Sequence, residues 1–423
     1  MKKLTLVATA IMGLLSTSAA MAQSTVTVYG ILDAGYNHVS GLRQGSVSTI
    51  ASGIMEGSRF GLRGSEDIGG GYKAIFTLEN RLELDTGSVT NRPNSGTQMP
   101  DRVATSVAAS VAGLPIPVAT RDTIINTVNT SLATGGFGVN LTGNLFDRQA
   151  YVGLVTPVGA FTLGRQYTPG YLVAAQFDAS QTQSSLAAGQ VASLPAAFDI
   201  RLSNTLQYAI QTGGVTALLM YGAGEVAGSN SASRFWGGMV TYKGDGFSVG
   251  YGHNGKNNEL GQKSLTNDLI GATVDVGPGT LYGQYATIKD DNPSGISSIA
   301  SQVTTASGSA VVGAAFQNAY NAAFRQDARL MHIGYRLTTG PHTWVVAFNR
   351  LDDKRTVNAD TDSYGFTYTY ALSKRTNLNA VLTRFNNKGQ GQVAPGGNGF
   401  LGGVTSAAGV GSTNIALGIR HTF

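Results

Sequence analysis

The sequence predicts an all-β fold, a 16-stranded antiparallel transmembrane β-barrel, on three observations. Apolar and polar side chains alternate with a period of two along the chain to its last residue. Tight turns and long polar loops follow one another in order, as a barrel with two different ends requires. Charged residues make up only 13% of the chain, and glycine accounts for 57 of 423 residues, about twice its average usage.

The first 22 residues have the pattern of a secretory signal peptide. Two lysines precede the apolar stretch Leu4–Leu15, and Ala20-Met21-Ala22 is a small-residue cleavage site. The apolar stretch is too short to span a membrane as a helix. We therefore expect cleavage after residue 22 and a single barrel domain over residues 23–423, with an N-terminal helix of the mature fold as the alternative.

Charge and cysteine content exclude several classes of function. Loss of the two N-terminal lysines lowers the formal charge of +5 by two, which is too small a charge to indicate a nucleic-acid partner. Without cysteine the chain has no disulfide framework and no thiol chemistry. The five histidines are scattered and lie near no nucleophile motif, and no metal-ligand spacing occurs. We expect no enzyme activity, no cofactor and no metal, with an outer-membrane barrel enzyme as the remote alternative.

Seven tight turns divide the mature chain into strand-like segments. Each combines glycine, proline or polar turn residues between two alternating stretches. They lie at Asp67–Gly71, Pro157–Gly159, Thr212–Gly214, Gly244–Gly246, Gly277–Gly279, Thr339–Pro341 and Ser373-Lys374. Eight longer loops separate them, so the turns and loops together join sixteen strands.

The strand-like segments place apolar and aromatic side chains on one face. In "DSYGFTYTYAL", residues Tyr364, Phe366 and Tyr368 share one face, and the small or polar residues share the other. "TWVVAFN" and the terminal "TNIALGIRHTF" alternate in the same way. Segments of about ten residues are long enough to cross a bilayer as tilted strands.

A soluble β-sandwich would also alternate, so the alternation needs further support. The asymmetry between short turns and long loops, and the aromatic-rich faces, favour the barrel. In lipid every backbone amide must be paired, which requires a closed sheet. A wide closed sheet exposes apolar side chains to hydrocarbon and polar side chains to water in its lumen.

Several stretches carry a family resemblance: "TVTVYGILDAG", "GSRFGLRGSEDIGGGYKAIFTLE", "RQAYVGL", "GAFTLGRQYTP" and "GIRHTF". On these motifs the mature chain resembles the Gram-negative general porins, beta-proteobacterial branch. The resemblance implies a homotrimeric outer-membrane pore, placed in lipid by the outer-membrane assembly machinery. It implies passive diffusion of small hydrophilic solutes and ions, and a third loop folded into each barrel. A substrate-specific channel is the alternative within the same class.

Long loops are predicted at about residues 85–145, 169–200, 290–326 and 386–412, and the first three of them depart from the family pattern. The first of these is far longer than is usual in the family. In the third, Phe316, Tyr320 and Phe324 have helical spacing, which predicts a short amphipathic helix. We interpret both of these loops as surface insertions.

Strand parity selects the residues that line the lumen, because charges are costly on the lipid face. Phe60 and Leu62 face out, so Arg59 and Arg63 face in. Taking Tyr151 as an outward aromatic places Arg148 inside, and the outward positions of Leu206 and Tyr208 place Arg201 inside.

The resemblance gives these residues roles in a pore constriction. It implies that Arg59, Arg148 and Arg201 form a basic wall and that Glu79 lies near it. Asp178 is the candidate for the opposing acid, since residues 169–200 contain only one other acid, Asp199. Such a wall predicts mild anion selectivity. The alternative is that these arginines are solvated lumen residues without a shared role.

Two further residues have predicted roles outside the pore. Arg165 shares the parity of outward-facing Phe161 and Leu163, and the resemblance suggests a trimer contact with an acid of residues 83–101 of a neighbouring subunit. A local bulge that turns Arg165 inward is the alternative. Phe423 ends the last strand and is the predicted assembly signal, or simply an interfacial aromatic residue.

Overall fold

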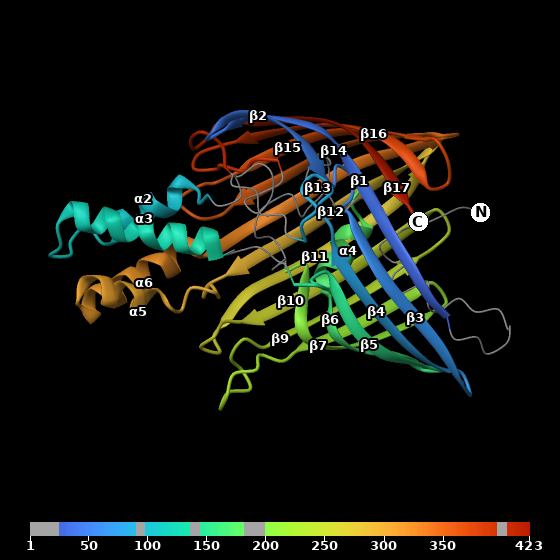
Figure 1. The fold of residues 1–423 in the computed structure, drawn as a ribbon, viewed down its shortest axis with the longest axis horizontal. Helices are drawn as coiled ribbons and strands as arrows, with labels where there is room; N and C mark the ends of the chain where they lie inside the picture. Colours follow the sequence, from blue (N-terminus) through green and yellow to red (C-terminus); the bar gives the residue numbers. More distant parts are fainter. Residues whose placement is uncertain (1–24, 90–97, 136–143, 182–198, 396–403) are drawn as a thin grey trace.

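The computed structural model describes residues 25–89, 98–135, 144–181, 199–395 and 404–423. They form one closed antiparallel β-barrel, with a group of helices projecting from the end opposite the C-terminus (Figure 1). None of the described helices is long and apolar enough to span a membrane. The predicted signal peptide lies outside the described residues.

The barrel wall consists of 17 strands, most of which pair with their neighbours in sequence. The strands are β1 (Thr25–Leu42), β2 (Gly45–Ser52), β3 (Arg59–Gly69), β4 (Tyr72–Arg81), β5 (Gln149–Thr156), β6 (Gly159–Tyr167), β7 (Arg201–Thr212), β8 (Val215–Gly222), β9 (Phe235–Lys243), β10 (Phe247–Asn257), β11 (Lys263–Val276), β12 (Gly279–Asp290), β13 (Gln326–Thr339), β14 (His342–Asp353), β15 (Thr361–Ala371), β16 (Thr376–Asn387) and β17 (Ser412–Thr422). Pairing of β1 with β17 closes the ring.

Two of these strands share one position in the wall. The first part of β1, Thr25–Ile31, pairs with β3, and the second part, Ala34–Leu42, pairs with β2. Residues 53–58, which connect β2 to β3, leave the sheet between them. The 17 strands therefore fill sixteen positions, and the predicted 16-stranded antiparallel barrel is confirmed.

All seven predicted tight turns join adjacent antiparallel strands. The turn between β7 and β8 shows the physical requirement. Gly213 and Gly214 have φ values of 53° and 87°, and a two-residue hairpin of this kind needs positive φ at both positions. Glycine adopts this backbone conformation without steric cost.

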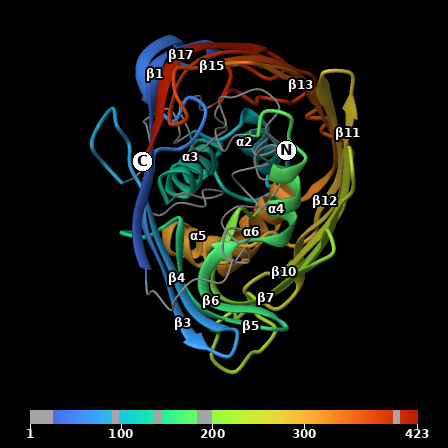
Figure 2. The same ribbon diagram turned by 90° about the vertical axis from the view of Figure 1, so that its right-hand side faces the viewer.

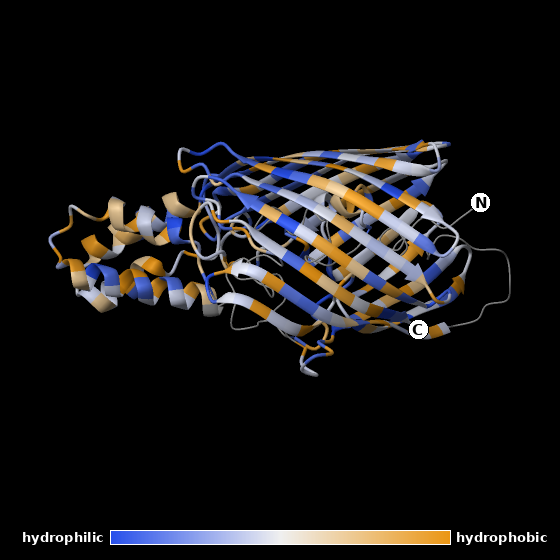
Figure 3. Cartoon of the chain, turned by 90° about the horizontal axis from the view of Figure 1, so that it is seen from above, coloured by the Kyte–Doolittle hydropathy of each residue, from blue (hydrophilic) through white to orange (hydrophobic). Residues whose placement is uncertain are grey.

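The two faces of the wall have opposite chemistry. On β17, Ile415 and Leu417 are 49% and 59% exposed, whereas Asn414 and Ala416 are fully buried. The same inversion on other strands gives the wall its alternating apolar and polar bands (Figure 3). A surface of exposed aliphatic and aromatic side chains around a polar interior fits a barrel that crosses the outer membrane.

Two of the long loops contain helices that pack together. α2 (Asp101–Ser110) and α3 (Val118–Gly135) lie between β4 and β5, and α5 (Ile299–Ser307) and α6 (Ala310–Phe324) lie between β12 and β13. The helix predicted from the aromatic spacing is present as α6, and its Phe316 and Tyr320 are fully buried. The two loops interpreted as surface insertions pack against each other, because all four helices contribute to one apolar core.

A further helix, α4 (Pro169–Gln176), follows β6 and packs against β9, β10 and β11. It lies on the face opposite the exposed side chains Val249 and Tyr251, and in the view down the barrel it lies within the ring of strands (Figure 2). Residues 182–198, which complete the predicted third loop, lie outside the described residues.

Candidate pore constriction

Three of the predicted arginines meet on the inner face of the wall. Arg59 is the first residue of β3, Arg148 directly precedes β5, and Arg201 is the first residue of β7. Their exposed fractions are 6%, 2% and 4%. Because β3, β4, β5, β6 and β7 are successive neighbours in the sheet, residues about 140 positions apart in the sequence reach one site.

Glu79, near the end of β4, is the acid of this cluster. Nε of Arg148 donates to Oε1 of Glu79 over 2.7 Å, and the hydroxyl of Tyr29 donates to Oε2 over 3.1 Å. The side chain of Glu79 is only 5% exposed. One carboxylate therefore offsets part of the charge of several guanidinium groups, which would otherwise repel one another strongly in this partly desolvated place.

Tyr167, the last residue of β6, links two of the arginines. Its hydroxyl accepts a hydrogen bond from Nη2 of Arg148 at 2.9 Å and from Nη2 of Arg201 at 2.8 Å. The guanidinium of Arg201 also lies over the Tyr167 ring, 4.4 Å from its centroid. This arrangement holds Arg148 and Arg201 at fixed positions despite their like charge.

Arg63 is on the same face of β3 as Arg59 but lies apart from the cluster. It is exposed, and its guanidinium lies 5.2 Å from the centroid of the Tyr29 ring. Since Tyr29 also bonds Glu79, the ring lies between Arg63 and the buried carboxylate. Arg63 therefore lies next to the arginine cluster and is more open to water than Arg59, Arg148 and Arg201.

Parity reasoning missed three further ion pairs at this site. Arg81 and Glu83 form a buried hydrogen-bonded pair just past Glu79. Arg81 shares the odd parity of Glu79, so the sequence contained the signal for its inward position. Glu56 lies 2.8 Å from Nη1 of Arg420 and 3.8 Å from Nη2 of Arg59. No strand pattern could indicate Glu56, because residues 53–58 are not part of a strand.

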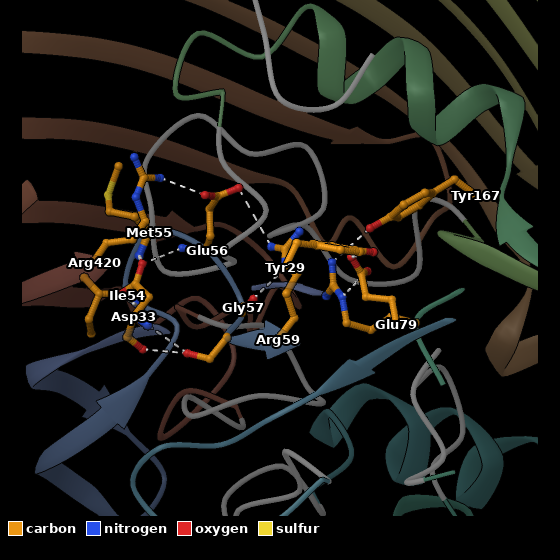
Figure 4. A network of polar contacts seen from close by, with 12 residues as sticks. Tyr29, Asp33, Ile54, Met55, Glu56, Gly57, Arg59, Glu79, Tyr167 and Arg420 are labelled. Carbon is orange, nitrogen blue, oxygen red and sulfur yellow. Dashed lines mark hydrogen bonds and ion pairs between the residues drawn. The ribbon is translucent and has the colours of Figure 1, made fainter. Parts of the chain in front are cut away.

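The segment of residues 53–58 is held in place by the carboxylate of Asp33 (Figure 4). Oδ1 accepts from the backbone N–H of Ile54 at 3.0 Å, and Oδ2 accepts from those of Met55 and Glu56 at 2.9 and 2.8 Å. Asp33 is fully buried. Backbone groups that leave a sheet must find other partners, and one side chain here satisfies three of them.

The structure places Asp178 away from the arginines. Its carboxylate accepts from the backbone N–H and hydroxyl of Ser180 at 2.9 and 2.8 Å. The adjacent peptide bonds contact β13, where Ala179 N–H donates to Nε2 of His332 and Arg336 donates to the carbonyls of Ala179 and Ser180. Burial raises the pKa of the Asp178 carboxyl well above its ordinary value.

Glycines in the wall make room for α4 and for Phe177, which directly follows it. A Cβ on Gly250 or Gly271 would lie 2.6 or 2.3 Å from the ring of Phe177, which is fully buried. Gln284 strengthens the contact by donating to the carbonyl of Ala174 over 2.9 Å. The position of α4 thus depends on small residues in strands that lie 70 or more positions further along the chain.

The prediction that Tyr151 faces outward is wrong. Tyr151 pairs with Thr77, whose hydroxyl donates to the Tyr151 hydroxyl over 3.0 Å on the buried inner face. Exposed Val152 and Leu154 form the outer face of β5 instead. Arg148 is nevertheless inside. It precedes β5, so the parity of the strand does not set its direction, and its hydrogen bond to Glu79 holds its side chain on the inner face.

Arg165 is half-buried and bonded within its own chain. Its Nε donates to the carbonyl of Asp147 over 2.6 Å, and its Nη1 donates to the hydroxyl of Ser203 over 3.1 Å. The pairing of β6 with β7 shifts between Gly164 and Gln166, so the sheet is irregular at this position.

Of the acids in residues 83–101, two are engaged within the same chain. Glu83 bonds Arg81, and Asp101 bonds Arg43 at 2.5 Å. Asp85 is exposed and is the remaining acid for a contact between subunits. The predicted contact of Arg165 with a neighbouring subunit stays a prediction.

Phe423 lies on the outer face at the closure of the barrel. Its backbone exchanges two hydrogen bonds of 3.2 Å with Gly30, and its side chain is 42% exposed. A Cβ on Gly30 would lie 2.4 Å from the Phe423 ring. Its role as an assembly signal stays a prediction.

Among the described residues, no group of three or more histidine, aspartate or glutamate side chains is placed to hold a metal ion.

Comparison with known proteins agrees with this architecture. A family model described as Gram-negative porin matches residues 7–390. The chain is 26% identical over 441 residues to outer membrane porin protein 32 of Delftia acidovorans, covering all of both chains. Its fold is similar to that of an anion-selective porin from Comamonas acidovorans, with a TM-score of 0.66 and 23% identity over 95% of this chain and all of the other. It is also similar to OmpF of Salmonella typhi in complex with daunomycin, with a TM-score of 0.56 and 15% identity over 94% and 97% of the two chains.

The family match covers nearly the whole chain, and the closed 16-position barrel is its fold. The protein is accordingly a β-barrel of the Gram-negative outer membrane and belongs to the Gram-negative porin family.

Proposed function

We propose that this porin is a water-filled channel for passive diffusion of small hydrophilic solutes and ions, with a preference for anions. The observation that supports the preference is the cluster of Arg59, Arg148 and Arg201 on one side of the lumen. Arginine stays protonated and is weakly hydrated, so it presents a permanent positive charge at low desolvation cost. A transverse field from such a wall sorts ions by the sign of their charge.

The charge of Arg59 is only loosely paired. Within the described residues, its buried Nη2 makes no hydrogen bond and lies 3.8 Å from Glu56, so its positive charge still contributes to the field in the lumen. A structurally similar porin from Comamonas acidovorans is anion-selective, which supports the same sign of selectivity here. Arg63 adds positive charge at the edge of the cluster, where it is exposed.

Asp178 has a smaller proposed role as the acid across the lumen. It lies with α4 near β13, whereas Arg59 and Arg201 lie on β3 and β7 and Arg148 directly precedes β5. Because burial raises its pKa despite the hydrogen bonds that it accepts from Ser180, the carboxyl contributes less negative charge than an exposed aspartate would. This asymmetry supports anion preference over cation preference.

The reversal potential of single channels in a salt gradient tests the proposal. Wild type should give the sign of an anion-selective pore, and Arg59→Gln should reduce its magnitude. Arg329→Gln is a charge-matched control, because Arg329 is exposed on β13 and lies outside the cluster. A reversal potential of the cation-selective sign in wild type would refute the proposal.

We propose a general channel rather than a substrate-specific one or an enzyme, on the family and on the placement of the aromatic residues. Most exposed aromatic side chains lie on the outer face, among them Tyr221, Trp236 and Tyr364. The stacked inner pair Tyr167 and Tyr171, with ring centroids 5.3 Å apart, is buried next to the arginines. Block of the single-channel current by one particular solute at micromolar concentration would favour a substrate-specific channel instead.

The assembled state proposed is a homotrimer in outer-membrane lipid. Support comes from the outward apolar band, which fits hydrocarbon or a neighbouring barrel, and from Arg165 beside it. The terminal aromatic Phe423 supports recognition by the assembly machinery. Cross-linking of the native protein in outer-membrane vesicles tests the trimer.

A further inference from the structure

Helices from two loops far apart in the sequence form one folded unit, the four-helix module α2, α3, α5 and α6. Its core contains side chains from all four helices: Val103, Val107, Ile125, Val128, Val303 and Phe316. Tyr320 is fully buried in this core, and its hydroxyl donates to the carbonyl of Ile125 at 3.2 Å and to Asn129 at 3.0 Å. A shared core of this size makes the two loops one body rather than two separate ones.

The module stands over one mouth of the barrel. Figure 1 shows its helices beyond the end of the barrel that carries the long loops. Seen down the barrel, the same helices lie within the outline of the wall (Figure 2). Long loops are on the extracellular side in barrels of this type. The module therefore covers the route from outside to the constriction.

Hydrogen bonds attach the module to loops around the rim. Asp101, at the start of α2, bonds Arg43 of the β1–β2 turn and exchanges bonds of 2.6 and 2.8 Å with Gln392 of the β16–β17 loop. Before α5, Gly295 N–H donates at 2.6 Å to Glu259 of the β10–β11 loop. Because attachments lie on separate parts of the rim, the module is fixed across the mouth.

The helices of the module carry little charge. α5 and α6 contain no acidic or basic residue, and α2 and α3 each contain one acid and one arginine. A typical protein surface has about 25–35% charged residues. A neutral module adds little to the field that acts on passing ions. It can therefore restrict solutes by size without altering the sign of the charge selection made by the arginines.

We propose that the four-helix module is an extracellular sieve that limits the size of solutes entering the channel. This inference depends on the proposed diffusion function and adds a second, outer selection step to it. Neutral sugars are the matching probe, because the arginine cluster does not select among uncharged molecules by charge.

The test compares wild type with a variant in which residues 99–143 and 296–324 are replaced by short glycine-serine linkers. Swelling rates of proteoliposomes are measured in mono-, di-, tri- and tetrasaccharides. We expect the tetrasaccharide rate, relative to the monosaccharide rate, to rise several-fold in the variant. An unchanged ratio would overturn the sieve.

A point variant tests the same idea if the shortened protein fails to fold. Tyr320→Asp places a charge in the core of the module but leaves the barrel and the rim bonds intact, so the sugar ratio should also rise. Asn318→Asp on the same helix is the control, because Asn318 is exposed. An equal ratio in wild type and Tyr320→Asp would likewise overturn the proposal.

Reversal potentials measured on the same variants separate the two proposals. Anion preference retained by the variants with an altered sugar ratio supports a sieve that acts by size. A reversal of sign on removal of the module would overturn the sieve, because the module would then select by charge. Cation preference in wild type would instead refute the proposed function, whatever the sugar ratio.

Discussion

Arg148 and Glu79 are joined by a hydrogen-bonded ion pair of 2.7 Å and by a backbone bond of 3.2 Å from Arg148 N–H to the Glu79 carbonyl. The two side chains are 3% and 5% exposed. The pair connects the end of β4 to the start of β5 at the point where the long loop with α2 and α3 leaves the wall. It therefore contributes both to the charge of the arginine cluster and to the pairing of β4 with β5.

Glu79→Gln should destabilise the barrel and increase its anion preference. Removing one member of a buried ion pair leaves the other charge uncompensated, at a cost of about 3 kcal/mol. The same change removes the negative charge in contact with Arg148. Urea unfolding followed by electrophoretic mobility measures the loss of barrel stability, and the reversal potential measures the anion preference. An unchanged or reduced anion preference would show that Glu79 does not offset the charge of the arginine wall.

Asp33→Asn should weaken the attachment of residues 53–58. Asparagine has one acceptor oxygen, and its amide nitrogen would face a backbone N–H that now bonds a carboxylate oxygen. The loss of charge-assisted bonds should cost about 2 kcal/mol in the free energy of unfolding. Asp67→Asn is the control, because Asp67 bonds only the exposed N–H of Gly69 in a turn. Equal unfolding curves for both variants would contradict this account.

Gly271→Val should displace Phe177 and, with it, α4. The new side chain would begin 2.3 Å from the Phe177 ring, and overpacking of this kind typically costs about 1–3 kcal/mol. We expect a smaller single-channel conductance, because an inner segment pushed off the wall moves towards the centre of the lumen. Gly283→Ala on β12 is the control, since its nearest neighbour lies 4.0 Å away. Identical conductance in Gly271→Val and wild type would mean that α4 does not narrow the pore.

Asp178 should make stability depend on pH in a specific direction. Burial raises its pKa, so the protonated form is favoured in the folded state. Its contribution to the free energy of unfolding is therefore complete below the ordinary pKa of an aspartate and is lost as the pH rises through the raised value. Asp178→Asn should remove this dependence and raise the thermal midpoint at neutral pH. If the thermal midpoint changed with pH in the same way in wild type and in Asp178→Asn, Asp178 would not be the source of the pH dependence.

Arg165→Ala should lower the melting temperature of the trimer without unfolding the monomer. Arg165 lies beside the outer face, and Asp85 is the exposed acid in the segment predicted to reach it. A double-mutant cycle with Asp85→Ala measures their coupling, which should be non-zero if the two side chains pair between subunits. Additive effects of the two substitutions would leave Arg165 with only its local bonds to Asp147 and Ser203.

The sequence by itself determined the strands of this protein, the faces of their side chains and the positions of the tight turns. Alternation along "TWVVAFN" and "TNIALGIRHTF" predicted which side chains face lipid, since that choice depends only on the parity of each residue within its strand. Turn residues such as Gly213 and Gly214 located the hairpins, because their backbone conformation is a local property. The same parity placed Arg59 and Arg201 inside the lumen.

The tertiary structure decided what depends on contacts between distant segments. The break between β2 and β3 follows from the bonds of Asp33, and the inward position of Tyr151 follows from its pairing with Thr77. The union of α2 and α3 with α5 and α6 required that two loops meet above the mouth. Local sequence patterns indicate periodicity and turn chemistry. They do not indicate which segment, distant in the sequence, will bury a given side chain.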